Sequence, residues 1–158
     1  MRFASAVSEA RDAGAATAAV IEAVRTGLDA LEPDLAFLFC SDAHAGAYER
    51  IACELREALP SALLVGCSAR SVIGAGREIE DRPGLSLTAA RLPGVTLSPM
   101  RLAGDGFPRG TSSWQEHFEI DAEPPPSFVV LADPFSCDAE ALVRQLDVDF
   151  ADSTLVGG

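Results

Sequence analysis

The sequence contains no lysine, and each of its twelve basic residues is an arginine. A chain without lysine has no side-chain amine for a Schiff base, which excludes that form of covalent catalysis within it. Basic residues are also outnumbered, because twelve arginines stand against 24 acidic residues and leave a formal net charge of −12. Phosphate backbones and anionic lipid surfaces repel such a chain, so neither nucleic acid nor a membrane is an expected partner.

Long apolar segments are missing as well. The first eight residues lack the apolar stretch of a signal peptide, and no run approaches the ~20 apolar residues that span a bilayer. His44, His117 and four scattered cysteines show no zinc-ligand spacing, so we predict no metal and no cofactor. We expect a soluble, cytoplasmic protein whose cysteines are reduced and mostly buried.

A large apolar fraction is present, 48% of 158 residues, which is enough for one packed domain. Strand-like runs at 2–7, 35–40 and 62–67 alternate with two segments of helical apolar spacing, 12–31 and 41–59. This alternation is typical of parallel strands that are joined by crossover helices. The predicted fold class is therefore α/β, with a mixed, largely parallel sheet and flanking helices.

Two further strand-like runs, 85–91 and 95–101, flank Leu92-Pro93-Gly94. A Pro-Gly pair between two such runs favours a tight reversal, so we expect an antiparallel hairpin at this point. The next stretch, 103–127, is interrupted by glycine and proline. It predicts a long connection with one short helix near 113–118.

An internal repeat relates two parts of the chain. When the sequence is shifted against itself by 91 residues, 36–67 aligns with 127–158 without a gap. Seven identities fall on strand ends, a helix start and a helix face: Phe37/Phe128, Asp42/Asp133, Glu49/Glu140, Leu55/Leu146, Leu64/Leu155, Val65/Val156 and Gly66/Gly157. We therefore predict a duplicated β-α-β unit within a single domain, 1–158. The second copy stops where the first continues into further strands, which predicts a parent chain that extends past Gly158.

Ligand sites in sheets of this kind form at the carboxyl ends of strands, where helix N-termini present backbone N–H groups. Three such ends carry suitable side chains, and we expect them to converge on one crevice if both copies lie in one sheet. The predicted ligand-binding residues are Ser41, His44, Gly66, Cys67, Ser68, Arg70, Arg77 and Asp133.

The two arginines of this set lie in a glycine-rich segment that allows the backbone to approach a ligand closely. Arg70 and Arg77 could hold a carboxylate by a two-point contact. The alternative is a tight strand-to-loop connection whose arginines pair at the surface with Glu78, Glu80 or Asp81. Spacing alone leaves both interpretations open.

Several motifs together resemble the FIST N-terminal domain. They are Leu64-Val-Gly-Cys-Ser-Ala, Val72-Ile-Gly-Ala-Gly-Arg-Glu-Ile-Glu and Pro83-Gly-Leu-Ser-Leu, with the strand Asp34-Leu-Ala-Phe-Leu-Phe, the segment Leu92-Pro-Gly-Val and a closing Val-Gly-Gly. The resemblance spans nearly the whole chain. It implies a sensory domain for small molecules such as amino acids, found in bacterial signalling proteins and in some eukaryotic F-box proteins. It also implies a C-terminal FIST domain as partner in the parent chain.

Two other functions stay open on the sequence. A thiol-dependent enzyme would use Cys67 as nucleophile, with His44 as base and Asp42 or Glu78 to orient it. A protein-interaction scaffold would show a broad exposed apolar patch and no enclosed pocket. The run Gly66-Cys-Ser-Ala-Arg lacks the second glycine of a hydrolase nucleophile elbow. We therefore predict a ligand-sensing module without catalytic residues.

Overall fold

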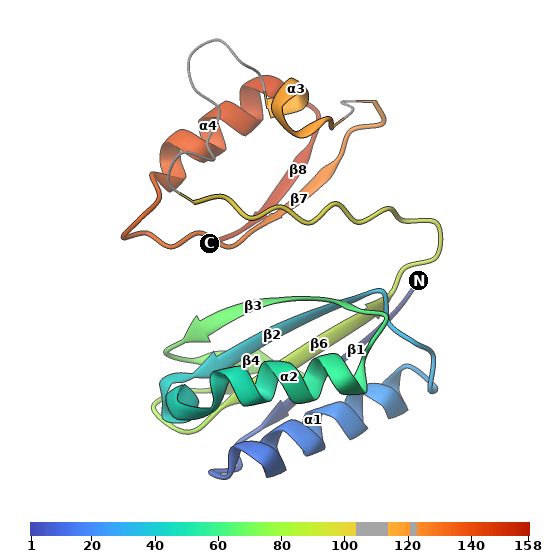
Figure 1. The fold of residues 1–158 in the computed structure, drawn as a ribbon, viewed down its shortest axis with the longest axis vertical. Coiled ribbons are helices and arrows are strands. Elements are labelled where there is room, and N and C mark those ends of the chain that lie inside the picture. Colours follow the sequence, from blue (N-terminus) through green and yellow to red (C-terminus); the bar gives the residue numbers. More distant parts are fainter. Residues whose placement is uncertain (104–113, 121–122) are drawn as a thin grey trace. The chain divides into compact units, whose positions relative to one another are not determined.

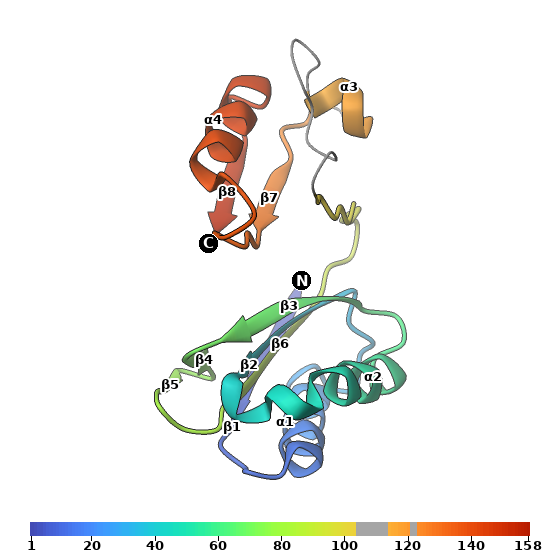
Figure 2. The same ribbon diagram turned by 60° about the vertical axis from the view of Figure 1, so that its left-hand side comes forward.

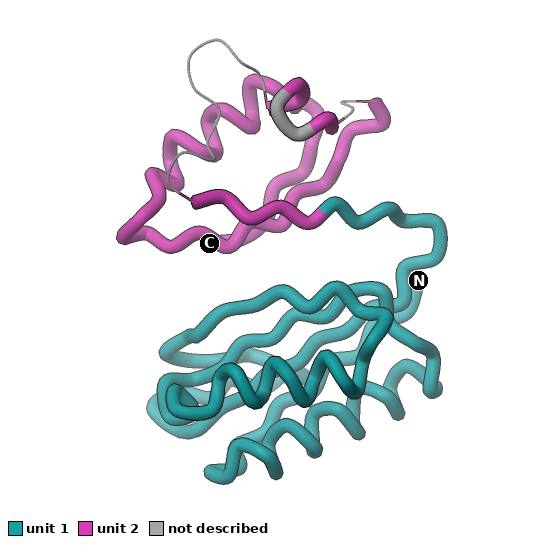
Figure 3. Tube along the Cα trace, in the orientation of Figure 1, with its two compact units in different colours: residues 1–98 teal, residues 99–158 magenta. Residues whose placement is uncertain are grey.

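The computed structural model describes residues 1–103, 114–120 and 123–158. The chain forms two compact units, Met1–Ser98 and Pro99–Gly158, which we call unit 1 and unit 2 (Figure 3). Part of the predicted 103–127 connection, namely 104–113 and 121–122, lies outside the described residues. The short helix expected near 113–118 is confirmed as α3, Trp114–Phe118.

Unit 1 contains a four-stranded sheet in the order β1-β6-β2-β3 (Figure 1). Its strands are β1 (Arg2–Ser8), β2 (Leu35–Ser41), β3 (Leu63–Ala69) and β6 (Leu85–Arg91). β6 is antiparallel to both β1 and β2, whereas β3 is parallel to β2. β1, β2 and β3 therefore run in the same direction, as crossover connections require. The predicted mixed α/β fold is confirmed.

Two α-helices, α1 (Ala13–Gly27) and α2 (Tyr48–Ala58), cover one face of this sheet (Figures 1 and 2). α1 begins where the sequence predicts, because the carboxylate of Asp12 accepts a hydrogen bond from the Ala15 backbone N–H at 2.8 Å. α1 ends four residues earlier than the predicted limit of 31. A turn follows Leu28, whose side chain is fully buried in the core.

The core of unit 1 lies between the two helices and the sheet. Apolar residues at every second position of β6 face α1 and α2 because strand side chains alternate between faces. The buried residues of the core include Leu85, Leu87 and Ala89 of β6, Val20 and Val24 of α1, and Ile51 and Leu55 of α2.

The predicted hairpin between 85–91 and 95–101 is wrong. β6 pairs with β1 along one edge and with β2 along the other, so no edge is left for a third strand, and 95–100 forms none. The antiparallel hairpin of unit 1 is instead formed by β4 (Val72–Gly74) and β5 (Arg77–Ile79). It is fastened to the sheet by the Ser86 hydroxyl, which donates to the Ile73 carbonyl at 2.6 Å.

Unit 2 contains a parallel pair of strands, β7 (Ser127–Val130) and β8 (Thr154–Gly157), joined by the helix α4 (Ala139–Asp149). Its core consists of buried Trp114, Leu142, Leu146 and Phe150, with Phe128, Val130 and Leu155 packed against them. The rings of Phe128 and Phe150 meet edge to face with their centroids 5.0 Å apart.

The two strand-helix-strand segments can be compared element by element. α2 and α4 have eleven residues each, and their bounds differ by 91, the spacing of the sequence repeat. In the sheets, however, Leu38 pairs with Gly66 while Val130 pairs with Gly157. The first strands therefore correspond at a spacing of 92, which moves Phe37 and Phe128 out of equivalent positions. Descent of the two segments from one duplicated unit stays a prediction.

Candidate functional site

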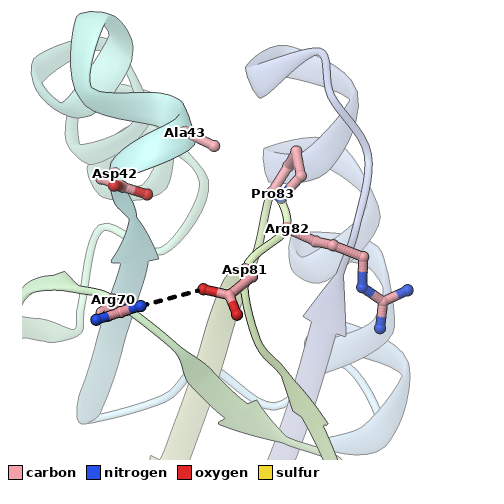
Figure 4. Close-up of a pocket in the computed structure, with 6 residues that line it drawn as sticks. All are labelled: Asp42, Ala43, Arg70, Asp81, Arg82 and Pro83. Carbon is pink, nitrogen blue, oxygen red and sulfur yellow. Dashed lines mark ion pairs between the residues drawn. The ribbon is translucent and has the colours of Figure 1, made fainter.

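An open cavity of about 520 Å³ lies at the carboxyl ends of β2 and β3 in unit 1 (Figure 4). β2 is followed directly by the 3-10 helix η1 (Asp42–Ala47), and β3 by Arg70. The third wall is the segment that leads into β6. The lining residues are Asp42, Ala43, Arg70, Asp81, Arg82 and Pro83.

Two acidic residues, Asp42 and Asp81, and two arginines, Arg70 and Arg82, are among the residues that line this cavity. Arg70 is paired with Asp81 across it at 3.6 Å, and both side chains are largely exposed, 87% and 78% (Figure 4). An exposed pair at this distance contributes only ~0–1 kcal/mol. The guanidinium of Arg70 can therefore exchange Asp81 for an incoming anion at little cost.

The other two arginines of this region are held by Glu9, which follows β1. Arg82 is 2.7 Å from one oxygen of Glu9, and Arg77 contacts the other. In Figure 4 the Arg82 guanidinium points away from Asp42 and Arg70. Of the two predicted arginines, only Arg70 lines the cavity. Arg77 forms a surface ion pair instead, although its partner is Glu9 and none of the three acidic residues that the sequence suggested.

Ser41, at the end of β2, is almost completely buried. Its backbone N–H donates to the Gly84 carbonyl at 2.8 Å, and its hydroxyl accepts from the Gly84 N–H at 2.9 Å. Its own carbonyl accepts from the Tyr48 hydroxyl at 3.1 Å. Ser41 thus ties β2 to the segment entering β6. Ser41 also occupies the N-cap position of η1, but its side chain makes no capping bond to that helix.

His44 lies in η1, only 3% exposed. Its Nε2 atom has no hydrogen-bond partner among the described residues. The residue belongs to the same helix as Asp42 and Ala43, but it is not one of the residues that line the cavity.

A second, smaller cavity of about 210 Å³ lies between α2 and the end of β3. It brings together three of the predicted residues, Gly66, Cys67 and Ser68, all of them exposed on β3. The remaining lining residues are largely apolar: Leu38, Cys40, Tyr48, Ile51 and Ala52. Of the predicted residues of unit 1, Arg70 lines the first cavity and the three on β3 line the second. The other three line neither cavity: Ser41, His44 and Arg77.

Gly66 is required by the close approach of β3 to β2. A Cβ atom at this position would lie 1.8 Å from the backbone oxygen of Leu38. The same contact recurs in unit 2, where a Cβ on Gly157 would lie 1.9 Å from the oxygen of Val130. No side chain fits at either place, which explains the glycine that both halves of the sequence repeat share.

The cysteines are less buried than the sequence predicts. Only Cys40 is buried, Cys137 is partly so, and Cys53 and Cys67 are exposed. Burial raises the pKa of the Cys40 thiol from 9.0 to about 11. Cys67 is exposed because β3 is an edge strand. The edge position of β3 depends on the order of the strands in the sheet, which the sequence around Cys67 does not indicate.

Asp133 belongs to unit 2 and is fully exposed there. Its carboxylate accepts hydrogen bonds from the Ser136 hydroxyl at 2.7 Å and from the Phe135 N–H at 3.1 Å. These two bonds lower its pKa, with the hydroxyl as the larger cause. The expectation that Asp133 meets the strand ends of unit 1 in one crevice stays a prediction.

The ligand-binding residues predicted from the sequence do not include three that line the cavity: Asp81, Arg82 and Pro83. That choice considered only the ends of parallel strands. Because β6 is antiparallel to β2, the start of β6 lies at the same edge of the sheet as the end of β2. The direction of β6 depends on its pairing with β2, and this pairing places the segment 81–83 at the cavity.

Within the described ranges, no three His, Cys, Asp or Glu side chains are grouped so that they could hold a metal ion. None of the helices among these residues is long and apolar enough to cross a membrane.

Comparison with known proteins places this architecture in a family. The model of the FIST N domain matches residues 34–158. The chain is 25% identical over its whole length to "Uncharacterized protein Rv0628c" of Mycobacterium tuberculosis and to "Uncharacterized protein Mb0898c" of Mycobacterium bovis, and it spans about 40% of the length of each. No solved structure matches it. The chain belongs to the FIST N domain family, which is associated with sensing in signal transduction.

Proposed function

We propose that this chain is the small-molecule-sensing domain of a cytoplasmic bacterial signalling protein, with a C-terminal FIST domain as its partner in the parent chain. The observation that carries the proposal is the cavity of about 520 Å³ at the ends of β2 and β3. Its volume falls within the range of ~300–1,000 Å³ that small-molecule sites occupy. Membership of the FIST N domain family supports a sensing role.

The charges around the cavity favour a ligand that carries both signs. Arg70 offers a guanidinium that can bind a carboxylate through two hydrogen bonds. Asp42 and Asp81 would repel a simple anion, but they can accept hydrogen bonds from an ammonium group. An α-amino acid combines both groups, and we propose this class as the ligand.

A thermal-shift screen of the twenty amino acids tests the proposal. Each active amino acid is compared with the carboxylic acid and the amine that carry the same side chain. At 100-fold excess over Kd a ligand adds about 2.7 kcal/mol to stability, which corresponds to a rise in Tm of about 5–10 °C for a chain of this size. The amino acid should raise Tm, and each half-molecule should raise it far less. A folded chain that shifts with none of the twenty would contradict the proposal.

Two arginine variants locate the site. Arg70→Ala should abolish the shift because it removes the guanidinium of the cavity. Arg50→Ala is the matched control: Arg50 is also exposed and paired with one carboxylate, Glu54 at 3.8 Å, but it does not line the cavity. A ligand that stabilises the Arg70→Ala variant as well as the parent chain binds elsewhere.

Sensing is proposed in preference to thiol catalysis because the two required side chains differ in accessibility. Cys67 is exposed on β3, whereas His44 is 3% exposed. Cys53 is exposed too and serves as an internal reference. We expect iodoacetamide to label Cys67 and Cys53 at similar rates at pH 7. Labelling of Cys67 more than about ten-fold faster would indicate an activated thiolate and favour the enzyme.

A further inference from the structure

We propose that the outer edge of β7 in unit 2 accepts one antiparallel β-strand, supplied by the segment that follows Gly158 in the parent protein. Among the described residues, β7 is paired with β8 alone, in a two-stranded sheet. An isolated pair of strands leaves one edge of each strand without backbone partners. This surface belongs to unit 2, whereas the ligand cavity is formed by unit 1.

The hydrogen bonds of β7 show which groups are unpaired. Val130 accepts from the Gly158 N–H at 3.1 Å, and Ala132 donates to the Gly158 carbonyl at 2.8 Å, so the backbone groups of both residues face β8. Successive residues of a strand direct these groups to opposite edges. The N–H and C=O of Val129 therefore lie on the outer edge. Val129 is also 53% exposed, and its neighbour on β8, Val156, is 54% exposed.

Unit 1 covers the corresponding edge with an antiparallel strand. Phe37 occupies in β2 the position of Val129 in β7, since Leu38 and Val130 make the same contact with a glycine of the next strand. Phe37 pairs with Thr88 of β6. β6 follows β3 along the chain and ends at Arg91, 25 residues after Gly66. A strand at the same distance beyond Gly157 would complete unit 2 in the same way.

The lengths of the relatives agree with this source for the strand. The chain spans about 40% of the relatives that it matches, so more than half of their length lies outside the match. The incoming strand should be apolar at alternate positions, as β6 is with Leu85, Leu87 and Ala89, because one of its faces would lie over α4.

Amide hydrogen exchange tests the proposal in two proteins. One is the 158-residue chain, and the other is the same chain extended past Gly158 by at least 25 residues of its own gene product. The Val129 amide should exchange about 100-fold more slowly in the extended protein. Equal exchange in both proteins would overturn the proposal. A gene product that ends at Gly158 would overturn it as well. Slow exchange of Val129 in the short chain that depends on protein concentration would also overturn it, because a second copy of the chain would then bind this edge.

A pair of variants provides an independent readout. Val129→Pro removes the outward N–H without touching a bond to β8, and proline is tolerated at the open side of an edge strand. Val129→Thr is the control, because it keeps the N–H and the branched shape. Proline should lower Tm relative to threonine by several degrees in the extended protein and by much less in the short chain. The same difference in both proteins would show that no strand binds this edge.

Discussion

Replacement of Gly66 by alanine tests how closely β3 approaches β2. The new Cβ would lie 1.8 Å from the Leu38 oxygen, 2.8 Å from its carbonyl carbon and 3.0 Å from its nitrogen. A carbon and an oxygen rarely approach closer than about 3.3 Å, so the two strands would have to move apart by about 1.5 Å. All three atoms belong to the backbone, and no side-chain rotation can relieve the contact.

The cost of this movement is the loss of pairing around Gly66. Each ladder hydrogen bond contributes about 0.5–1.5 kcal/mol net, and separation of the strands weakens several of them together with the packing beneath. We expect Gly66→Ala to lower the free energy of unfolding by about 3–5 kcal/mol, a large share of the 5–15 kcal/mol typical of a domain. Gly46→Ala is the matched control, because among the described residues no atom outside its chain neighbours and its own helix backbone lies within 4 Å of the Cβ that it adds.

Urea unfolding can be followed separately in each unit. Tyr48, the only tyrosine, lies in α2 of unit 1, and Trp114, the only tryptophan, lies in unit 2. Gly66→Ala should move the Tyr48 transition to lower urea, whereas Gly46→Ala should leave it within about 1 kcal/mol of the parent. If the two variants unfold at the same urea concentration, β3 does not approach β2 closely enough at Gly66 to exclude a side chain.

Two further predictions concern polar groups. Ser41→Ala should cost about 1–3 kcal/mol, because the buried Gly84 N–H loses its acceptor; urea unfolding measures this, and an unchanged midpoint would show that the bond contributes nothing. The pKa of Asp133 is lowered in the folded chain, so its contribution to stability is present at neutral pH and lost as pH falls through the folded pKa. Ser136→Ala should move this pKa upward in an NMR titration, and an unmoved pKa would refute the role of the hydroxyl.

Much of the fold could be predicted because periodicity is a local property. The spacing of apolar residues located β1, α1, β2, α2 and β3, and Asp12 marked the start of α1. The family resemblance was readable for the same reason, since its motifs are short and continuous. Arg70 could be chosen because it directly follows the strand-like run that forms β3.

The pairing of the strands and the walls of the cavity depend on which distant segments contact each other, and local patterns in the sequence carry little information about such contacts. The insertion of β6 between β1 and β2 follows from competition among strands for the same edges, and it explains why 95–101 forms no hairpin. The pairing of Arg77 with Glu9 joins residues 68 positions apart, which no local spacing could indicate. Asp81 reached the cavity for a similar reason, because an antiparallel strand starts where its parallel neighbours end. Local propensity thus set the elements, whereas burial and edge pairing between distant segments set the partners of β6 and the walls of the site.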